Sequence, residues 1–294
     1  MNESTEVCSS RIMIHKTELS LQSIDIFHKR SKKHDNHKYN TIREHIICAI
    51  INNNVPEEFF RRNKDWSLHR QAIMDYIKRL HGGPFQSVSC ELKGGRIYNY
   101  DFLFIVDNIP YNVEFKFNAK NIEDVPQYYS PSKPSQYMSM WYEKFFYDKY
   151  LHRLAEAAGL QMPVQDIYLK TINRNDPKCM EEFKKKYKNE EWFNFACKQL
   201  ARYSIERFLL LVELDIHKLS NTLKEKQNKH FMLYSNGMYY YDKPNMEDFE
   251  IESYIVDSKN KNRFICKTKS GKPMYVLLRW KNGNGIAYPA FQIS

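Results

Sequence analysis

The sequence is poor in glycine and lacks the motifs of the common nucleotide-binding and hydrolytic sites. It has nine glycines among 294 residues, and neither G-x-x-x-x-G-K nor G-x-G-x-x-G occurs in it. Loops that cradle phosphate groups need such glycines because their backbone must approach the ligand closely. The patterns G-x-S-x-G and H-E-x-x-H are also missing, which argues against the corresponding serine-hydrolase and zinc-protease sites. We therefore expect no nucleotide cofactor.

Clustered cysteines and long apolar segments are missing as well. The six cysteines are scattered, with no C-x-x-C and no histidine at zinc spacing, so we expect reduced thiols in an intracellular protein, cytoplasmic or nuclear. The first ten residues, MNESTEVCSS, lack the apolar core of a signal peptide, and we expect no secretion. No apolar run approaches the length of a membrane span, so we expect no membrane partner, and we expect the apolar run Phe208 to Val212 to form a buried strand.

Basic and aromatic residues are abundant. The net charge is +10, and aromatic side chains make up 15 % of the chain. Hydrophobic residues account for 42 %, which is enough to build a core. A basic balance favours anionic partners, with nucleic acid ahead of an anionic membrane surface. A generally solvated, lysine-rich surface is the alternative explanation of the charge.

The stretch Asn99 to Lys120, NYDFLFIVDNIPYNVEFKFNAK, has the clearest functional pattern. Two apolar runs flank the turn residues 107–110, and this arrangement predicts a β-hairpin. Glu114 and Lys116 share one face of the second strand because side chains alternate between the faces of a strand. Asp101 lies near the start of the first strand, so it should lie opposite the far part of the second. Two carboxylates and one ammonium group are expected to converge there.

Such a convergence suits metal-dependent hydrolysis. Two close carboxylates repel each other unless a cation or a proton lies between them. Mg²⁺ accepts one or two protein carboxylates and takes water and phosphate oxygens as its other ligands. A lysine beside the metal can orient or deprotonate one of those waters. The alternative is a cross-strand ion pair on a solvated strand face, with no further role.

Asp101, followed by Glu114-Phe115-Lys116 on the next strand, resembles the motif of the PD-(D/E)XK nuclease superfamily, which has the restriction-endonuclease-like fold. The sequence departs from the family pattern in having Tyr100 in place of proline. The resemblance implies that Asp101 and Glu114 hold Mg²⁺, with Mn²⁺ able to substitute, and that Lys116 positions and activates the attacking water. It also implies an endonuclease for double-stranded DNA, similar to a type II restriction endonuclease, that works as a homodimer. A repair or recombination nuclease, an RNA-directed nuclease and a non-catalytic nucleic-acid-binding protein are the alternatives.

The segments before the hairpin are expected to be helical and then extended. A helix from about Thr41 to Ile51 begins with Thr41-x-x-Glu44, which fits a capping box. The resemblance makes Glu44 a candidate to join the metal site, whereas capping alone would also explain it. A second helix is expected over 65–80 and a strand over 85–92. The turn that follows contains Lys93 and Arg96, which could hold a phosphate or belong to an ordinary Gly-Gly turn.

The segments after the hairpin are expected to begin with a long loop and a long helix. Ser132, Lys133 and Ser135 lie in or directly after a proline-rich loop, where they could contact a nucleic-acid backbone. Ser135 should cap a helix over 136–158. The resemblance makes Gln136, in its first turn, a candidate to approach the site, although a surface position explains it equally. A short strand is expected over 163–171, a helical stretch over 178–203, and a central strand over 207–216.

The sequence pattern of the C-terminal part predicts a small β-meander. An Asn-Gly pair at 236–237 separates two apolar runs and is a strong hairpin signal, and three further β runs follow it. Lys267 and Lys269 belong to a run of cations with no acidic residue after Asp257. We expect them to contact DNA; lysines that protect a sheet edge from aggregation are the alternative.

Together these patterns predict an α+β (α/β) protein. Its centre should be a restriction-endonuclease-like mixed sheet flanked by helices, with a small C-terminal β-meander lobe. The expected division is an N-terminal basic arm over 1–40, a nuclease core over 41–228 and a β-rich lobe over 229–294.

Overall fold

The computed structural model describes residues 11–14, 17–29, 36–94, 98–125, 134–174, 177–280 and 289–293. The chain forms two compact units, and each consists of two segments of sequence. Unit 1 comprises Met1–Val125 and Asn228–Pro244, and unit 2 comprises Pro126–Gln227 and Asn245–Ser294. The structure is a mixed α+β protein with one five-stranded mixed sheet and one smaller antiparallel sheet of four strands, together with a short two-stranded ribbon.

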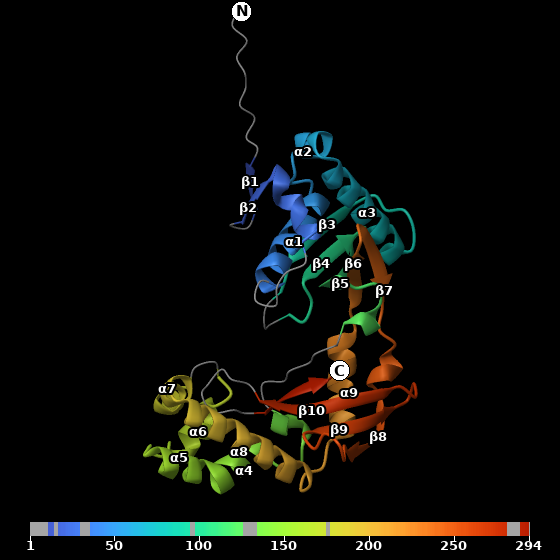
Figure 1. The fold of residues 1–294 in the computed structure, drawn as a ribbon. Coiled ribbons are helices and arrows are strands. Elements are labelled where there is room, and N and C mark those ends of the chain that lie inside the picture. Colours follow the sequence, from blue (N-terminus) through green and yellow to red (C-terminus); the bar gives the residue numbers. More distant parts are fainter. Residues whose placement is uncertain are drawn as a thin grey trace, which may run out of the picture. The chain divides into compact units, whose positions relative to one another are not determined.

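A five-stranded sheet forms the centre of unit 1 (Figure 1). Its order is β3 (Val88–Leu92), β4 (Phe102–Val106), β5 (Ile109–Phe117), β6 (His230–Ser235) and β7 (Met238–Asp242). The strands β5 and β6 are parallel, and every other neighbouring pair is antiparallel. Between β5 and β6 the chain passes through the first segment of unit 2, so the parallel pairing joins residues more than a hundred positions apart in sequence.

Two tight turns fix the register of this sheet. Asp107 and Asn108 have φ angles of 46° and 66° and connect β4 to β5. Asn236 and Gly237 have φ angles of 51° and 82° and connect β6 to β7. Two consecutive residues with positive φ match the right-handed twist of the strands that they join, which explains the asparagine and glycine at these places. Both predicted hairpins are therefore confirmed, although the second belongs to the sheet of unit 1.

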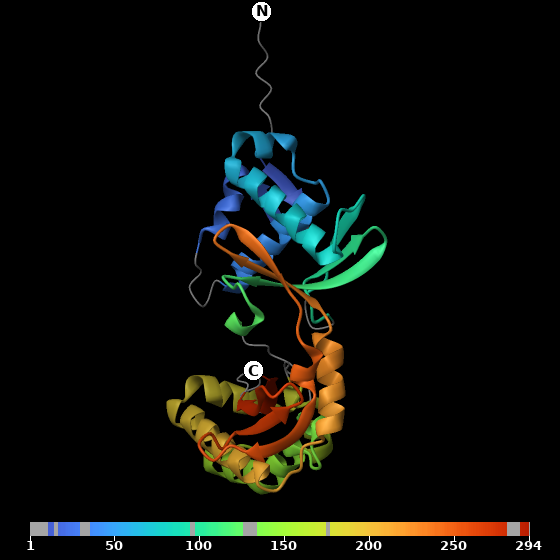
Figure 2. The same ribbon diagram turned by 90° about the vertical axis from the view of Figure 1, so that its right-hand side faces the viewer.

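Helices cover one face of the five-stranded sheet. They are α1 (Asn36–Ile51), α2 (Glu57–Arg62) and α3 (Lys64–His81), and α3 confirms the helix predicted over 65–80. Ile47, Ile73 and Ile77 are buried against Phe102 and Phe115 of the sheet. A smaller cluster of Ala119, Phe231 and Leu233 lies apart from that core. Figure 2 shows α3 and the sheet from the side, with β6 and β7 in orange beside β5 in green.

The N-terminal segment is part of unit 1 and not a separate basic arm. It contains β1 (Arg11–Ile14), β2 (Thr17–Ser20) and the 3-10 helix η1 (Leu21–Phe27). Ile24 and Phe27 are buried in the same core as α1 and α3. The boundary expected at residue 40 is thus wrong, because apolar side chains before it are needed to complete this core.

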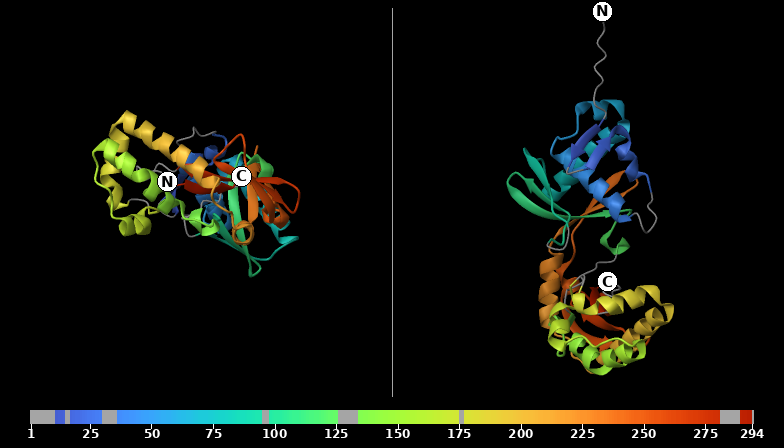
Figure 3. Two further views of the ribbon diagram at one scale, coloured as in Figure 1. Left: turned by 90° about the horizontal axis from the view of Figure 1, so that it is seen from below. Right: turned by 90° about the vertical axis from the view of Figure 1, so that its left-hand side faces the viewer.

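Unit 2 contains helices packed on a four-stranded antiparallel sheet. The helices are α4 (Tyr142–Phe146), the π-helical turn η4 (Tyr147–Leu151), α5 (His152–Ala158), α6 (Gln165–Thr171), α7 (Glu181–Asn189), α8 (Glu191–Leu209) and α9 (Ile216–Gln227). The sheet has the order β11 (Pro289–Ile293), β10 (Pro273–Trp280), β9 (Arg263–Thr268) and β8 (Ile251–Val256). Short 3-10 helices are η2 (Ile122–Asp124) in unit 1 and η3 (Pro134–Tyr137), η5 (Lys178–Met180) and η6 (Met246–Phe249) in unit 2. Figure 3 shows the green and gold helices beside the red strands.

The structure corrects four predicted elements of unit 2. The strand expected over 163–171 is the helix α6, and the helix expected over 136–158 is divided among η3, α4, η4 and α5. The stretch 178–203 is divided into η5, α7 and α8. The central strand expected over 207–216 is the end of α8, a loop and the start of α9. Short apolar runs suit a buried helix face as well as a buried strand, which is why the run at 208–212 was misleading.

Packing in unit 2 explains why the run 208–212 forms the end of a helix and a loop instead of a strand. Phe208 and Leu209 are buried in the core of unit 2, whereas Leu210 and Leu211 are 67 % and 63 % exposed. Asp215 accepts a hydrogen bond of 3.0 Å from the backbone N–H of Lys218 and thereby caps α9. The strand that pairs with β5 is β6 instead, so the boundary expected at 228/229 does not separate a nuclease core from a β lobe.

Candidate active site

The β4–β5 hairpin brings Asp101 close to Glu114. Phe102 and Val113 are the last pair of the β4–β5 register on this side, and Asp101 directly precedes β4. The backbone N–H of Asp101 donates to the carbonyl of Val113 at 3.0 Å, and the N–H of Phe115 donates to Oδ2 of Asp101 at 2.8 Å. The charge of Glu114 is one of the causes that raise the pKa of Asp101, so the two carboxyl groups lie close enough to interact. The predicted convergence of these two carboxylates is therefore confirmed.

Two lysines hold the carboxylate of Glu114. Lys116, two residues further along β5, donates a short hydrogen bond to Oε1. Lys229, directly before β6, donates to Oε2 at 2.9 Å and also to the backbone carbonyl of Asn99. The side chains of Lys229, Glu114 and Lys116 are 7 %, 14 % and 31 % exposed, so the cluster opens to solvent at Lys116.

Lys229 was not singled out from the sequence. It stands in Gln227-Asn228-Lys229-His230, with no motif around it, and a single lysine before an apolar strand is ordinary. Only the parallel pairing of β6 with β5 brings it to Glu114. Its near-complete burial beside a carboxylate marks it as part of the cluster.

Glu44 is connected to the cluster electrostatically, and the capping role expected for it is wrong. The helix α1 begins at Asn36, and the hydroxyl of Thr41 donates to the carbonyl of His37 at 3.0 Å inside the helix. Thr41 is therefore not an N-cap. Burial, together with the negative charges of Asp101 and Glu114, raises the pKa of Glu44 to about 8, although Lys116 opposes this increase. Glu44 thus adds a third carboxyl group to the cluster.

The ionisation states within the cluster differ from residue to residue. Burial, together with the charge of Glu114, raises the pKa of Asp101 to about 6. Burial opposes ionisation of Glu114 as well, but Lys116 and Lys229 overcome this and lower its pKa. The charge of Glu114 likewise outweighs burial at Lys116 and raises its pKa. Glu114 is thus a carboxylate and Lys116 an ammonium group, whereas Asp101 and Glu44 hold protons more tightly than exposed carboxyl groups do.

This set of donors fits Mg²⁺. The cluster supplies carboxylate oxygens, which are the ligands that this ion prefers, and burial together with the neighbouring negative charge raises the pKa of Asp101 and of Glu44. Within the described ranges no three His, Cys, Asp or Glu side chains gather closely enough to form a metal cage. Mg²⁺ usually binds to one or two carboxylates and keeps water or phosphate as its other ligands, so Asp101 and Glu114 would be sufficient.

Glu44→Gln is expected to stabilise the metal-free protein at high pH. The pKa of Glu44 in the folded protein, about 8, lies above its value of 4.5 in the unfolded chain, so the stability linked to its protonation is complete below pH 4.5 and is lost as the pH rises through 8. Glutamine cannot ionise, and the variant should gain up to about 5 kcal/mol over the parent at pH 9 and almost nothing at about pH 4. Urea unfolding in EDTA at both pH values measures this. Equal stabilities at pH 9 would show that Glu44 is well solvated.

The described interactions of this cluster involve none of the other predicted site residues. Lys93 pairs with Glu91 at 2.6 Å. Lys267 lies 3.0 Å from Glu252, and Lys269 lies 3.8 Å from Glu247 and 3.6 Å from Glu250. Gln136 is exposed in η3 of unit 2, while the described interactions of the cluster come from unit 1.

The side chains of four residues that were predicted to contact nucleic acid are not described by the structure. Arg96, Ser132 and Lys133 lie outside the described residues, and of Ser135 only the backbone, in η3, is described. The cysteines within the described ranges, Cys48, Cys90, Cys179, Cys197 and Cys266, are free thiols.

Comparisons with known proteins gave no match to a family model, to a curated protein or to a solved structure. None of the helices in the described part of the chain combines the length and the apolar character of a membrane span.

Proposed function

We propose that the protein is a Mg²⁺-dependent endonuclease that hydrolyses phosphodiester bonds of double-stranded DNA. The observation that carries the proposal is the convergence of Asp101, Glu114 and Lys116 at one end of a hairpin in a mixed sheet. Glu44 supports it, since a third carboxyl group would be an unfavourable addition to a purely structural ion pair. The net charge of +10 suits a polyanionic substrate.

Each residue of the cluster has a distinct role in this proposal. Asp101 and Glu114 would hold Mg²⁺, which supplies Lewis-acid stabilisation of the phosphate charge and lowers the pKa of a bound water. Lys116 is protonated, so it acts as a hydrogen-bond donor that orients the attacking water and offsets charge on the phosphate. Lys229 orients Glu114 through Oε2. Glu44, with a pKa of about 8, can accept or donate a proton near neutral pH.

The topology of unit 1 supports a restriction-endonuclease-like core. The helices α1, α2 and α3 precede the meander β3–β4–β5, and β6 pairs in parallel with β5, the strand that carries Glu114 and Lys116. A type II restriction endonuclease is the function that we favour, acting as a homodimer so that two sites cut two strands. A repair or recombination nuclease with the same fold is consistent with the same residues. The free thiols suit an intracellular location.

One observation favours a second function, that of a nucleic-acid-binding protein without catalysis. Both oxygens of Glu114 are already engaged, Oε1 by Lys116 and Oε2 by Lys229. Such a carboxylate is neutralised without a metal, so the cluster could serve only to stabilise the sheet. Binding of nucleic acid that weakens with salt is expected for both functions, and only turnover distinguishes them.

The purified protein is expected to cleave a mixed-sequence plasmid in Mg²⁺ or Mn²⁺ and to leave it intact in EDTA. Discrete fragments would establish a sequence-specific endonuclease, and a smear would indicate a processing nuclease. Lys116→Ala should lower the rate at least about 100-fold, because removing one charge-stabilising donor costs this much in other hydrolases.

A control variant and a competition complete this experiment. Lys78→Ala removes an exposed lysine of α3 that pairs with Asp75 at 3.6 Å, and it should cleave like the parent. Absence of cleavage, together with salt-sensitive binding, would select the non-catalytic function. Competition between DNA and RNA of matched sequence would identify an RNA-directed nuclease.

A further inference from the structure

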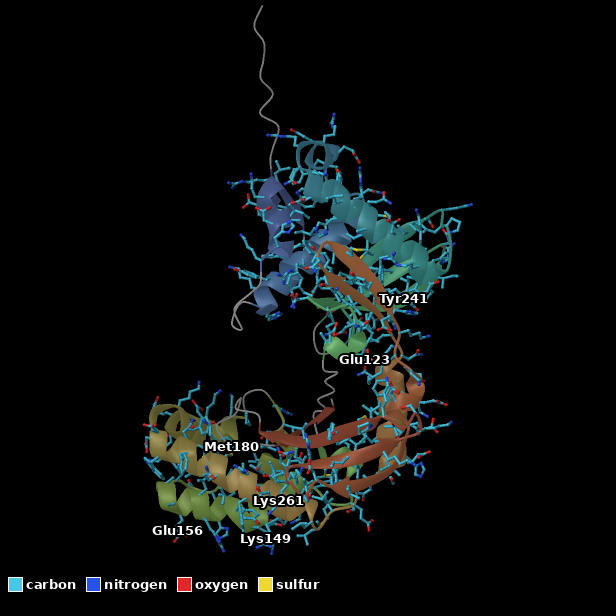
Figure 4. All side chains as sticks on the ribbon, turned by 45° about the vertical axis from the view of Figure 1, so that its right-hand side comes forward. Glu123, Lys149, Glu156, Met180, Tyr241 and Lys261 are labelled. Atoms are coloured by element: carbon cyan, nitrogen blue, oxygen red, sulfur yellow. The ribbon has the colours of Figure 1, made fainter. Side chains whose placement is uncertain are left out.

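Unit 2 has a groove of about 610 Å³ on its surface. One side is formed by the last turns of α8, and the other by the end of β8 and the turn that leads to β9. The lining residues are Tyr203, Glu206, Arg207, Leu210, Val256, Asp257, Ser258 and Lys261. Figure 4 labels Lys261 on this turn. All of these residues belong to unit 2.

The turn between β8 and β9 is held in place by Asp257. This carboxylate accepts hydrogen bonds from Arg263 Nε at 2.6 Å, from the backbone N–H of Lys259 at 2.8 Å and from the side chain of Asn260 at 3.3 Å. The backbone N–H of Asp257 also donates to the carbonyl of Arg263 at 3.0 Å. Asp257 is 3 % exposed, and the arginine lowers its pKa far below the usual range. Lys259 and Lys261 therefore extend from an ordered turn. Because the backbone of this turn is already fixed, ligand binding loses little further conformational entropy there.

The opposite side of the groove presents hydrogen-bond donors. Arg207 Nε donates to the hydroxyl of Tyr203 at 3.2 Å, and its guanidinium group lies 5.5 Å from the centre of the same ring. Because the tyrosine oxygen accepts this bond, its own O–H remains available to donate. The terminal nitrogens of Arg207 and the ammonium group of Lys261 add further donors that carry positive charge.

The acidic residues of the groove are compensated, whereas its cations face no carboxylate in the described interactions. Glu206 lies 3.4 Å from Arg202, and Asp257 lies 2.6 Å from Arg263. The lysines of the neighbouring β-sheet differ, since Lys267, Lys269 and Lys272 each lie within 4 Å of an acidic side chain. The lining has two acidic and two basic residues, but both acids are paired with arginines outside the lining, which leaves the charges of Arg207 and Lys261 for a ligand. Two such cations with several donors suit a phosphate backbone.

We propose that this groove of unit 2 binds the phosphodiester backbone of duplex DNA through Arg207, Lys261 and the hydroxyl of Tyr203. The inference rests on the proposed function for the identity of the polyanion, and it moves the DNA contact of this unit away from Lys267 and Lys269. Contacts to phosphates position a duplex without reading its sequence. The groove would therefore contribute affinity for DNA of any sequence.

The test is a binding titration of fluorescein-labelled duplex DNA by the full-length protein in the Asp101→Asn background, in EDTA and at several salt concentrations. The variant Arg207→Ala/Lys261→Ala should bind about 10-fold more weakly near 50 mM salt. The slope of log K against log salt should fall by about two, since each lost phosphate contact removes about one. Tyr203→Phe keeps the ring and removes the donor, and a smaller loss in affinity is expected.

Lys185→Ala/Lys188→Ala is the matched control. It removes the same charge from exposed positions of α7, in the same unit and near the other end of the long helix α8. This control should bind like the parent. Thermal unfolding of all variants shows whether unit 2 remains folded, and Arg207→Gln/Lys261→Gln replaces the alanine variant if that protein does not fold.

Equal binding and an equal salt slope for the groove variant and the parent would overturn the inference. So would an equal loss in the α7 control, which would mean that only net charge matters, or a larger loss in Lys267→Ala/Lys269→Ala. Plasmid cleavage is measured separately with the protein in which Asp101 is unchanged. A protein that never cleaves but loses affinity with Arg207 and Lys261 would keep this inference and refute the proposed nuclease activity.

Discussion

Asp101→Asn is expected to lower Mg²⁺-dependent cleavage by at least about 1,000-fold and to make the metal-free protein more stable. The loss of activity follows because one of two metal-binding carboxylates disappears. The gain in stability follows from the pKa of Asp101, which is about 6 in the folded protein and 3.8 in the unfolded chain. The stability that comes from protonation of Asp101 is therefore complete below pH 3.8 and is lost as the pH rises through 6. At pH 8 the ionised carboxylate of Asp101 therefore lowers the free energy of unfolding, and asparagine removes this destabilisation.

Three measurements on parent and variant test this expectation together. Single-turnover cleavage gives the rate, a filter or anisotropy titration in EDTA gives DNA affinity, and urea unfolding at pH 8 gives stability with and without Mg²⁺. Mg²⁺ should stabilise the parent and leave the variant unchanged, because binding to the folded state alone adds to stability. DNA affinity in EDTA should not decrease.

Asp75→Asn is the control for a change of charge alone. Asp75 lies on the exposed side of α3, where it accepts hydrogen bonds from Gln71 at 3.0 and 3.1 Å. Its replacement should leave cleavage and the effect of Mg²⁺ unchanged. If Asp101→Asn cut DNA as fast as the parent and unfolded more easily, the cluster would be a structural ion pair and the nuclease assignment would fail.

Lys229→Met is expected to destabilise the protein by about 3 kcal/mol and to reduce cleavage. Lys229 donates to Glu114 at 2.9 Å and to the carbonyl of Asn99, and its side chain is only 7 % exposed. Removing one member of a buried ion pair leaves the partner charge without compensation, which costs much more than losing an exposed pair. Glu114 would also lose the contact that orients it toward the metal.

A second substitution separates the two effects of Lys229. In Lys229→Met/Glu114→Gln no buried carboxylate remains at this position, so part of the lost stability should return while cleavage does not. Lys224→Met is the control, since Lys224 lies 3.5 Å from Glu250 in a pair whose side chains are 35 % and 40 % exposed. The control should change the free energy of unfolding by less than about 1 kcal/mol. Full stability in Lys229→Met would contradict the role assigned to this lysine.

The sequence alone determined the local structure of the site. Alternation along 112–118 placed Glu114 and Lys116 on one face, and the turn at Asp107-Asn108 fixed which residues of β4 and β5 lie opposite each other. Both features depend on neighbours a few positions apart, so the residues themselves specify them. The hairpin also brings Asp101, which directly precedes β4, close to Glu114 on β5.

Only the tertiary structure decided the rest of the cluster and the division of the chain. Lys229 and Glu114 are 115 positions apart and meet because β6 pairs in parallel with β5, a pairing with no local signal. Glu44 has the pattern of a capping box, but α1 begins earlier, at Asn36. The apolar run at 208–212 could be buried as helix or as strand, and packing in unit 2 selected the helix. In each case contacts with residues distant in the sequence determined which of two local conformations of similar free energy formed. Hydrophobic periodicity depends only on nearby residues and cannot predict these contacts.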